Sequence, residues 1–168
     1  MKYATFFGGA INDTTTKEYQ DSILIGNLLA SKGYIVKNGG YRGLMEAVSK
    51  GTSEAGGKVI GYTCATFGFT QGNNYLTETN ISTDIYDRLR DLISSSEIFI
   101  IQRGGVGTLA EFFLLLDEMR KMNIKPEVFI FGEEWYKLIT SMGDFITPQQ
   151  LINLKFCKDF NDFKEIFK

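Results

Sequence analysis

The stretch IQRGGVGTLAEFF, from Ile101 to Phe113, decides the fold class of this chain. A strand-length apolar run ends in the first residues of this stretch, and three glycines follow within four residues. An apolar pattern with helical spacing begins directly after the glycines. A strand, a tight glycine turn and a helix, in this order, form the repeating unit of parallel α/β sheets. The stretch therefore predicts a strand–turn–helix unit with a carboxylate, Glu111, near the start of its helix.

Strand-length apolar runs alternate with segments of helical period along the rest of the chain. The expected strands are 3–7, 34–37, 58–63, 97–102 and 128–131, with a long polar loop at 64–80. The expected helices are 15–32, 43–55, 84–96, 108–123, 135–142 and 159–167. Strands that are apolar on both faces are typical of a parallel sheet covered by helices on each side. We therefore predict a Rossmann-like three-layer α/β sandwich with a mostly parallel sheet, formed by residues 1–168 as a single domain.

Composition excludes several classes of function. The net charge of −2 provides no broad basic field for a nucleic-acid polymer. Cys64 and Cys157 lack metal-ligand spacing, so no metal site is expected. No apolar run approaches membrane-spanning length, and the glycines at 8–9 come too early for a signal peptide, so a cytoplasmic protein without a membrane partner is expected. Because the chain has no histidine, proton transfer near neutral pH falls to carboxylates, cationic side chains or water.

Glycines at the ends of the expected strands point to one edge of the sheet. Ligands of open parallel sheets bind outside the carboxyl ends of the strands. The candidate ligand-binding glycines are Gly8, Gly9, Gly39, Gly40, Gly43, Gly104, Gly105 and Gly107. The last three precede a helix whose first N–H groups have no partner within the helix, which suits a phosphate. The alternative is a tight turn that binds nothing.

Thr108 and Glu111 have the spacing of a capping box, in which both side chains satisfy free N–H groups of the first helical turn. A carboxylate beside a phosphate site is repelled by the ligand, a cost that a purely structural residue need not carry. We therefore expect Glu111 to cap its helix and also to act in catalysis.

Arg88 lies on the edge of the apolar stripe of the helix expected at 84–96, whereas Arg90 lies on the opposite face. Arg88 is therefore expected to lean inward. It then either buries its stem and pairs with Asp84 or Asp91, or meets a nucleotide or Glu111.

A competing interpretation is a dinucleotide site. The segment GVGTLA, residues 105–110, matches the pattern G-x-G-x-x-A, and Glu133 follows the next strand where a ribose-binding acid would stand. This short pattern is common by chance, and it leaves Glu111 and the other glycine turns unexplained.

Two longer segments resemble the LOG family, also called lysine decarboxylase-like proteins. NGGYRGLMEAVSKGTSEAGGKVIG (38–61) and RGGVGTLAE (103–111) are similar to the family motifs GGGxxGLM, AGGxVIG and PGGxGTxxE. The resemblance covers residues 3–142. It implies a nucleotide-binding domain, without cofactor, that hydrolyses the N-glycosidic bond of AMP or a cytokinin-type ribotide to free base and ribose 5-phosphate. It also implies that Gly104, Gly105, Gly107 and Thr108 hold the phosphate, and that Glu111 and Arg88 are catalytic.

Three positions depart from the family pattern. Arg103 replaces the motif proline, Leu89 replaces a lysine after the catalytic arginine, and Asn38 replaces the first glycine of GGG. Arg103 adds a cation that either helps to bind the phosphate or pairs with Glu111. The stretch from 85 to 113 also looks closer to the branch that includes molybdenum-cofactor carrier proteins. The second hypothesis is therefore a nucleotide-binding carrier or sensor without hydrolysis.

The helix expected at 108–123 is apolar nearly all the way round. Its apolar residues include Phe112, Phe113, Leu114, Leu115, Leu116 and Met119. Such a helix requires burial on more than one side, so we expect a homodimer or higher homo-oligomer. The aromatic residues of the 64–80 loop, among them Phe67 and Phe69, either cover the base of a nucleotide or are simply packed.

Overall fold

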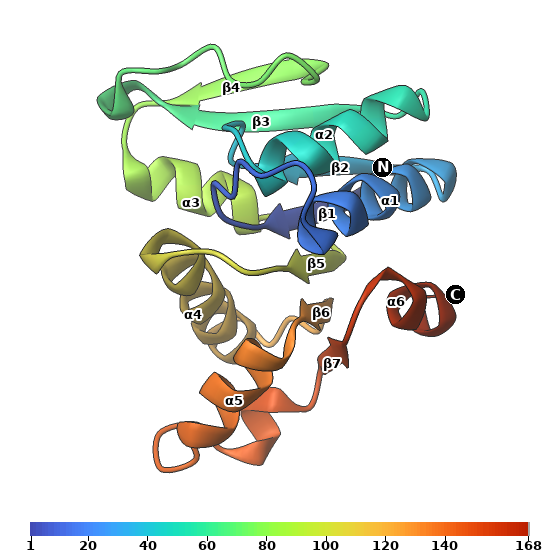
Figure 1. Cartoon of the computed structure of the whole chain (residues 1–168). Coiled ribbons are helices and arrows are strands. Elements are labelled where there is room, and N and C mark those ends of the chain that lie inside the picture. The colour runs from blue at the N-terminus through green and yellow to red at the C-terminus, as the bar shows by residue number, and fades with distance from the viewer. Residues whose placement is uncertain (168) are drawn as a thin grey trace.

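The computed structural model describes residues 1–167, which form a seven-stranded, entirely parallel sheet. The strands are β1 (Lys2–Phe7), β2 (Tyr34–Asn38), β3 (Val59–Cys64), β4 (Glu78–Ser82), β5 (Ile98–Ile101), β6 (Glu127–Phe131) and β7 (Leu154–Cys157). The helices are α1 (Lys17–Ser31), α2 (Leu44–Glu54), α3 (Ile85–Ile93), α4 (Val106–Lys121), α5 (Glu133–Ser141) and α6 (Phe160–Ile166), with 3₁₀ turns η1 (Ala65–Phe67) and η2 (Pro148–Leu151). The predicted Rossmann-like sandwich is confirmed (Figure 1).

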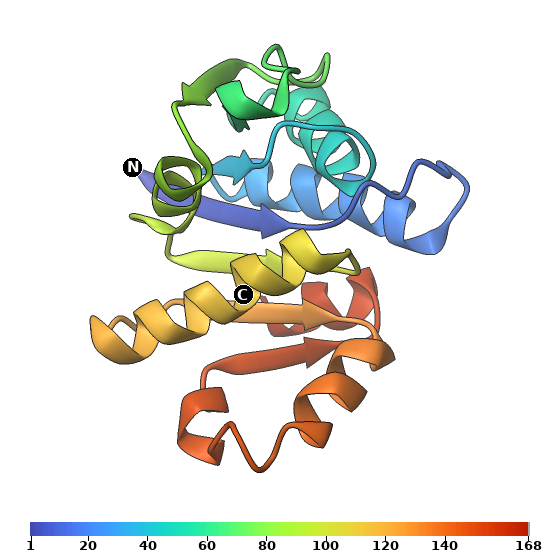
Figure 2. The same ribbon diagram turned by 90° about the vertical axis from the view of Figure 1, so that its left-hand side faces the viewer.

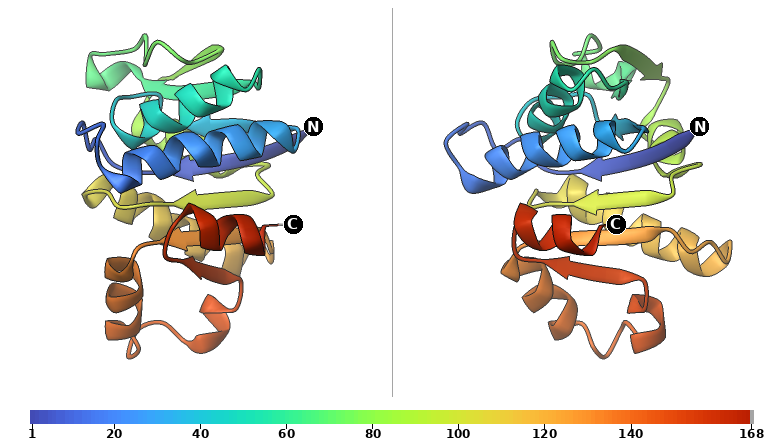
Figure 3. Two further views of the ribbon diagram at one scale, coloured as in Figure 1. Left: turned by 45° about the vertical axis from the view of Figure 1, so that its right-hand side comes forward. Right: turned by 90° about the vertical axis from the view of Figure 1, so that its right-hand side faces the viewer.

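Helices cover both faces of the sheet and create two apolar cores. On one face, α1, α2 and α6 pack against alternate residues of the strands, including Phe6, Ile100 and Phe129 (Figure 3). On the other face, α3, α4 and α5 pack against the intervening residues, such as Phe99 and Ile130 (Figure 2). Because neighbouring side chains of a strand point to opposite faces, a strand in this position is predominantly apolar.

The strand order is β4-β3-β2-β1-β5-β6-β7, so the direction of winding reverses between β1 and β5. The chain leaves β1 toward α1 on one face and leaves β5 toward α4 on the other face. This divergence makes the carboxyl ends of β1 and β5 the switch point at which open α/β sheets bind ligands.

Among the helices of residues 1–167, none combines the length and the apolar character that a membrane span needs.

Two strands at the edges of the sheet do not follow from the sequence pattern. β4 begins inside the segment 64–80 that was expected to be a loop and extends past it to Ser82, pairing with β3 from Ile60↔Glu78 to Cys64↔Ser82. β7 pairs with β6 and also lies outside the expected strands. Both are short and largely unburied, so they carry no continuous apolar run and owe their conformation to pairing with a neighbour.

Candidate functional site

The loops that follow β1 and β5 touch backbone to backbone. The amide of Gly9 donates a hydrogen bond to the carbonyl of Arg103 at 2.9 Å. A Cβ atom at Gly9 would lie 2.7 Å from the Cα of Gly104, and one at Gly104 would lie 2.0 Å from the Thr108 hydroxyl. Glycine is therefore required at both positions. By contrast, a Cβ at Gly105 or Gly107 would meet nothing within 4 Å, so the outer side of this loop is open.

The helix α4 begins two residues earlier than the sequence indicated. Gly105 is its N-cap and makes no side-chain cap, while Thr108 and Glu111 both lie inside the helix. The expected capping box of Thr108 and Glu111 is therefore wrong. Thr108 is only 4% exposed and lies in the first turn of the helix. The first turn of α4 thus presents N–H groups that no side chain caps, the arrangement that favours an anion.

Arg88 points inward from α3 and reaches Glu111. Its guanidinium Nη1 lies 3.5 Å from Glu111 Oε1, and only 8% and 12% of the two side chains are exposed. Arg88 also donates hydrogen bonds from Nε to the Tyr62 carbonyl at 2.7 Å and from Nη2 to the Gly39 carbonyl at 3.4 Å. The predicted inward orientation of Arg88 is confirmed, and of the partners that the sequence left open the structure shows Glu111.

Burial dominates the electrostatics of Glu111. Removal from water raises the pKa of the Glu111 carboxyl to about 7, and the positive charge of Arg88 offsets only part of this effect. A carboxylate with a pKa close to neutrality can accept a proton and release it again at physiological pH.

The turn after β2 forms one wall beside Arg88. A Cβ at Gly39 would lie 2.2 Å from Arg88 Nη2, and Gly40 adopts a positive φ of 80°. Asn38, which stands where the family has glycine, accepts a hydrogen bond from the Gly40 amide at 2.7 Å. The Asn73 side chain donates to the carbonyls of Gly40 and Tyr41. Asn38 is therefore part of a polar network that holds this turn.

Two further glycines serve packing between loops. A Cβ at Gly8 would lie 2.7 Å from the ring of Phe6, and one at Gly43 would lie 2.6 Å from the backbone of Ala10. Both residues allow close contacts within the protein, and neither lies against the Arg88–Glu111 pair in the way that Gly39 does.

The other two departures from the family pattern face away from this pair. Arg103 is exposed and lines a separate cavity of about 230 Å³ together with Lys17 and Lys158. Within residues 1–167 no ion pair joins Arg103 to Glu111. Leu89 lines the groove between α3 and α4 on the outer surface. The Arg103 alternative of pairing with Glu111 is thus not realised here.

Sequence reasoning missed Tyr41 as part of the site. The carbon of the Arg88 guanidinium lies 5.6 Å from the centre of the Tyr41 ring and 5.8 Å from that of Phe67. The Tyr41 hydroxyl accepts a hydrogen bond from the Cys64 amide at 3.1 Å. The position of Tyr41 directly after Gly39 and Gly40, at the end of a strand, was the sequence signal that could have identified it.

Glu133, which the dinucleotide interpretation assigned to the ribose, forms an ion pair with Lys137 at 2.9 Å.

Comparison with known proteins identifies the family. The sequence model of the SLOG cluster4 family matches residues 2–140. The chain belongs to the SLOG cluster4 family. The resemblance to LOG proteins is thereby confirmed, and the matched region contains both glycine-rich segments.

Three relatives of the SLOG cluster4 protein are informative. A cytokinin riboside 5′-monophosphate phosphoribohydrolase of Rhodococcoides fascians is 30% identical over 168 residues, covering 94% of this chain and 85% of that protein. The X-ray structure of TM1055 is 25% identical, with a TM-score of 0.78 and coverage of 99% of this chain and 98% of that one. The molybdenum cofactor carrier protein of Chlamydomonas reinhardtii is 22% identical, with a TM-score of 0.75 and coverage of 98% and 94%, which shows a shared fold.

Proposed function

We propose that this SLOG cluster4 protein is a cytoplasmic phosphoribohydrolase that cleaves the N-glycosidic bond of a nucleoside 5′-monophosphate, AMP or a cytokinin-type ribotide. The products are the free base and ribose 5-phosphate. The observation that carries the proposal is the buried Arg88–Glu111 pair, which lies one helical turn from an open glycine loop. The Rhodococcoides relative, named for this reaction, supports it.

In this proposal the phosphate binds to the loop before α4. The oxygens of the phosphate accept hydrogen bonds from the N–H groups of Gly105 and Gly107 and from the Thr108 hydroxyl, while Gly104 and Gly9 keep the two loops in contact. The positive end of the helix dipole adds to the attraction. Arg103 stands directly before this loop, and although its side chain lines the separate cavity, its positive charge adds to the long-range attraction for the phosphate.

The reaction passes through a state in which positive charge develops on the ribose ring. The ionised carboxylate of Glu111 stabilises that charge and takes a proton from a water molecule, whose oxygen forms the new bond to C1′. The C1′–N bond breaks with its electron pair passing to the base, which takes up a proton from solvent as it leaves; Glu111 afterwards releases the proton of the attacking water to solvent. Arg88 orients the carboxylate of Glu111, because its other N–H groups are held by the Tyr62 and Gly39 carbonyls.

A second candidate function is a carrier or sensor that binds a nucleotide without cleaving it. Its support is that Arg88 already engages Glu111, and that the fold is shared with a molybdenum cofactor carrier. Under this hypothesis a nucleotide binds stoichiometrically and is recovered intact.

The decisive experiment incubates the protein with AMP, CMP and an isopentenyl-adenosine monophosphate and measures free base by chromatography. We expect base release by the wild type and at least a 100-fold loss in Glu111→Gln. Glu165→Gln, an exposed carboxylate on α6, is the matched control and should retain full activity. Binding without base release in the wild type would favour the carrier instead.

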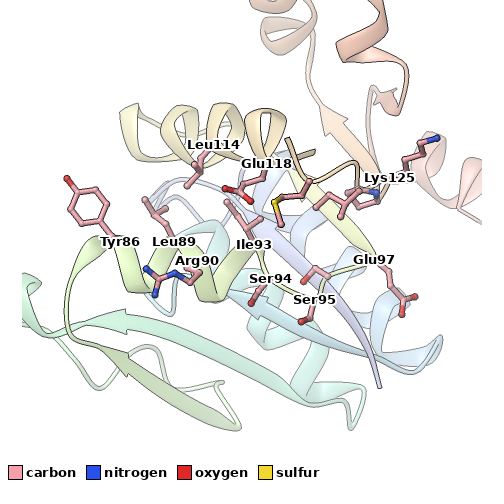
Figure 4. Close-up of a pocket in the computed structure, with 14 residues that line it drawn as sticks. Tyr86, Leu89, Arg90, Ile93, Ser94, Ser95, Glu97, Leu114, Glu118 and Lys125 are labelled. Atoms are coloured by element: carbon pink, nitrogen blue, oxygen red, sulfur yellow. The ribbon is translucent and has the colours of Figure 1, made fainter. Parts of the chain in front are cut away.

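We also propose that a second copy of the chain covers the outer groove between α3 and α4. The groove encloses about 700 Å³, and Leu89, Ile93 and Leu114 face one another across it (Figure 4). Arg90 lies on the α3 wall and Glu118 on the α4 wall, so the groove presents both signs of charge, as a self-complementary interface between two copies requires. The inner side of α4 is already covered, because Phe112, Leu115 and Met119 pack on the sheet.

A further inference from the structure

A small cavity with aromatic walls opens beside the glycine loops. It measures about 270 Å³ and is lined by Ala10, Asn12, Tyr41, Arg42 and Phe69. The rings of Tyr41 and Phe69 lie 6.4 Å apart at a tilt of 41°. Apolar walls with a few polar groups at the rim are typical of small-molecule sites.

The cavity adjoins both parts of the proposed active site. On one side, Ala10 directly follows Gly9, whose amide holds the Arg103 carbonyl at the glycine loop. On the other side, the ring of Tyr41 contacts the Arg88 guanidinium. A ligand that extends from the glycine loop past the ion pair therefore reaches this cavity next.

The exposure of the aromatic residues is not explained by packing. Phe67 and Phe69 are 50% and 47% exposed, although phenylalanine is among the residues most often buried. Phe67 covers the Arg88 guanidinium at 5.8 Å. Phe69 lines the cavity instead, and Gly68, which separates the two phenylalanines in the chain, adopts a positive φ of 80°.

We propose that this cavity is the subsite for the base of the nucleotide, and that the base stacks on Phe69 and Tyr41. Stacking uses the flat face that every base has, so it tolerates different bases but favours the larger ring system of a purine. The exposed Asn12 and Arg42 at the rim offer hydrogen bonds to the edge of the base. The inference rests on the proposed function, because it places the phosphate on the loop before α4.

Calorimetric titration tests the subsite in the Glu111→Gln protein, so that no ligand is consumed. AMP, CMP and ribose 5-phosphate are the probes. Replacing Phe69 with Ala in this background should weaken AMP binding at least about fivefold and leave ribose 5-phosphate binding unchanged. Phe69→Trp should restore AMP binding, and AMP should bind more tightly than CMP. Phe145→Ala, another exposed phenylalanine outside the cavity, is the matched control.

The outcomes separate the two proposals. AMP affinity that is unchanged by Phe69→Ala overturns the subsite while leaving the proposed function intact. An equal loss for AMP and ribose 5-phosphate also overturns it, because the change then acts on the phosphate site. If the protein with Phe69 intact binds neither ligand, the proposed function fails, and the base subsite fails with it.

Discussion

The guanidinium of Arg88 and the carboxylate of Glu111 lie 3.5 Å apart in a setting that is almost closed to water. Placing two charges there costs desolvation energy that their attraction repays only in part, so such a pair is weak evidence of a structural purpose. The pair also joins helices from two different strand–helix units, α3 and α4. Its position beside an open glycine loop is therefore better explained by chemistry than by stability.

Glu111 should make the stability of the protein depend on pH. Its pKa is raised to about 7 in the folded state, from an ordinary value of 4.5, so the folded protein binds more protons than the unfolded chain between these values. Stability from this group is complete below pH 4.5 and is lost as pH rises through 7. Relative to Glu111→Gln, the wild type should lose up to about 3 kcal/mol of unfolding free energy between pH 4.5 and 8. Urea unfolding followed by circular dichroism measures this, and parallel profiles for both proteins would contradict it.

The same ionisation should control catalysis. Because Glu111 acts as a carboxylate in the proposed mechanism, base release should be slow below pH 6 and rise through about pH 7. Initial rates between pH 5 and 9 at saturating AMP give this profile. A rate that stays flat across the range would remove Glu111 as the proton acceptor.

A pair of alanine variants separates the packing and binding roles of the glycine loop. Gly104→Ala places a Cβ 2.0 Å from the Thr108 hydroxyl and should destabilise the fold by about 1–3 kcal/mol. Gly105→Ala meets no atom within 4 Å and has a negative φ of −93°, so it should fold normally. It should nevertheless weaken AMP binding, since the added methyl group occupies the side from which the phosphate approaches. Thermal unfolding and titration with AMP test both statements, and unaltered AMP binding by Gly105→Ala would exclude this approach.

The groove between α3 and α4 should govern assembly. Leu114→Asp introduces a charge into that groove, so it should convert a dimer into a folded monomer. Light scattering at micromolar concentration gives the mass. Leu24→Asp, at an exposed leucine on α1, is the matched control and should remain dimeric. A monomeric mass for the wild type would refute the dimer.

A buried lysine provides a second dependence on pH. Lys37 Nζ donates a hydrogen bond to the Ser94 carbonyl at 2.7 Å and lies near the rings of Tyr62 and Tyr3. Burial lowers the pKa of Lys37 to about 8, although Asp91 acts in the opposite direction. The unfolded chain binds the extra proton between pH 8 and 10.5, so stability from this group rises over that window. The unfolding free energy of the wild type should therefore rise relative to that of Lys37→Met, and a constant difference would contradict the assignment.

The sequence predicted the fold class because five strands are buried on both faces and therefore carry continuous apolar runs. The apolar pattern did not predict β4 and β7. An edge strand is held in its conformation by pairing with one neighbour, and its side chains remain partly in water. The start of α4 was also misplaced, because the spacing of Thr108 and Glu111 imitates a capping box that the backbone does not form.

By itself, the sequence determined the parallel α/β architecture, the family, and the gathering of glycines at the carboxyl edge of the sheet. The tertiary structure alone decided that Arg88 meets Glu111, that Leu89 and Arg103 face elsewhere, and that Tyr41 and Phe69 share a cavity. The physical reason is the separation along the chain between the residues that interact. Apolar periodicity and glycine turns act between residues close in the chain, whereas these contacts join segments that become neighbours only when the crossovers bring separate strand ends to one edge.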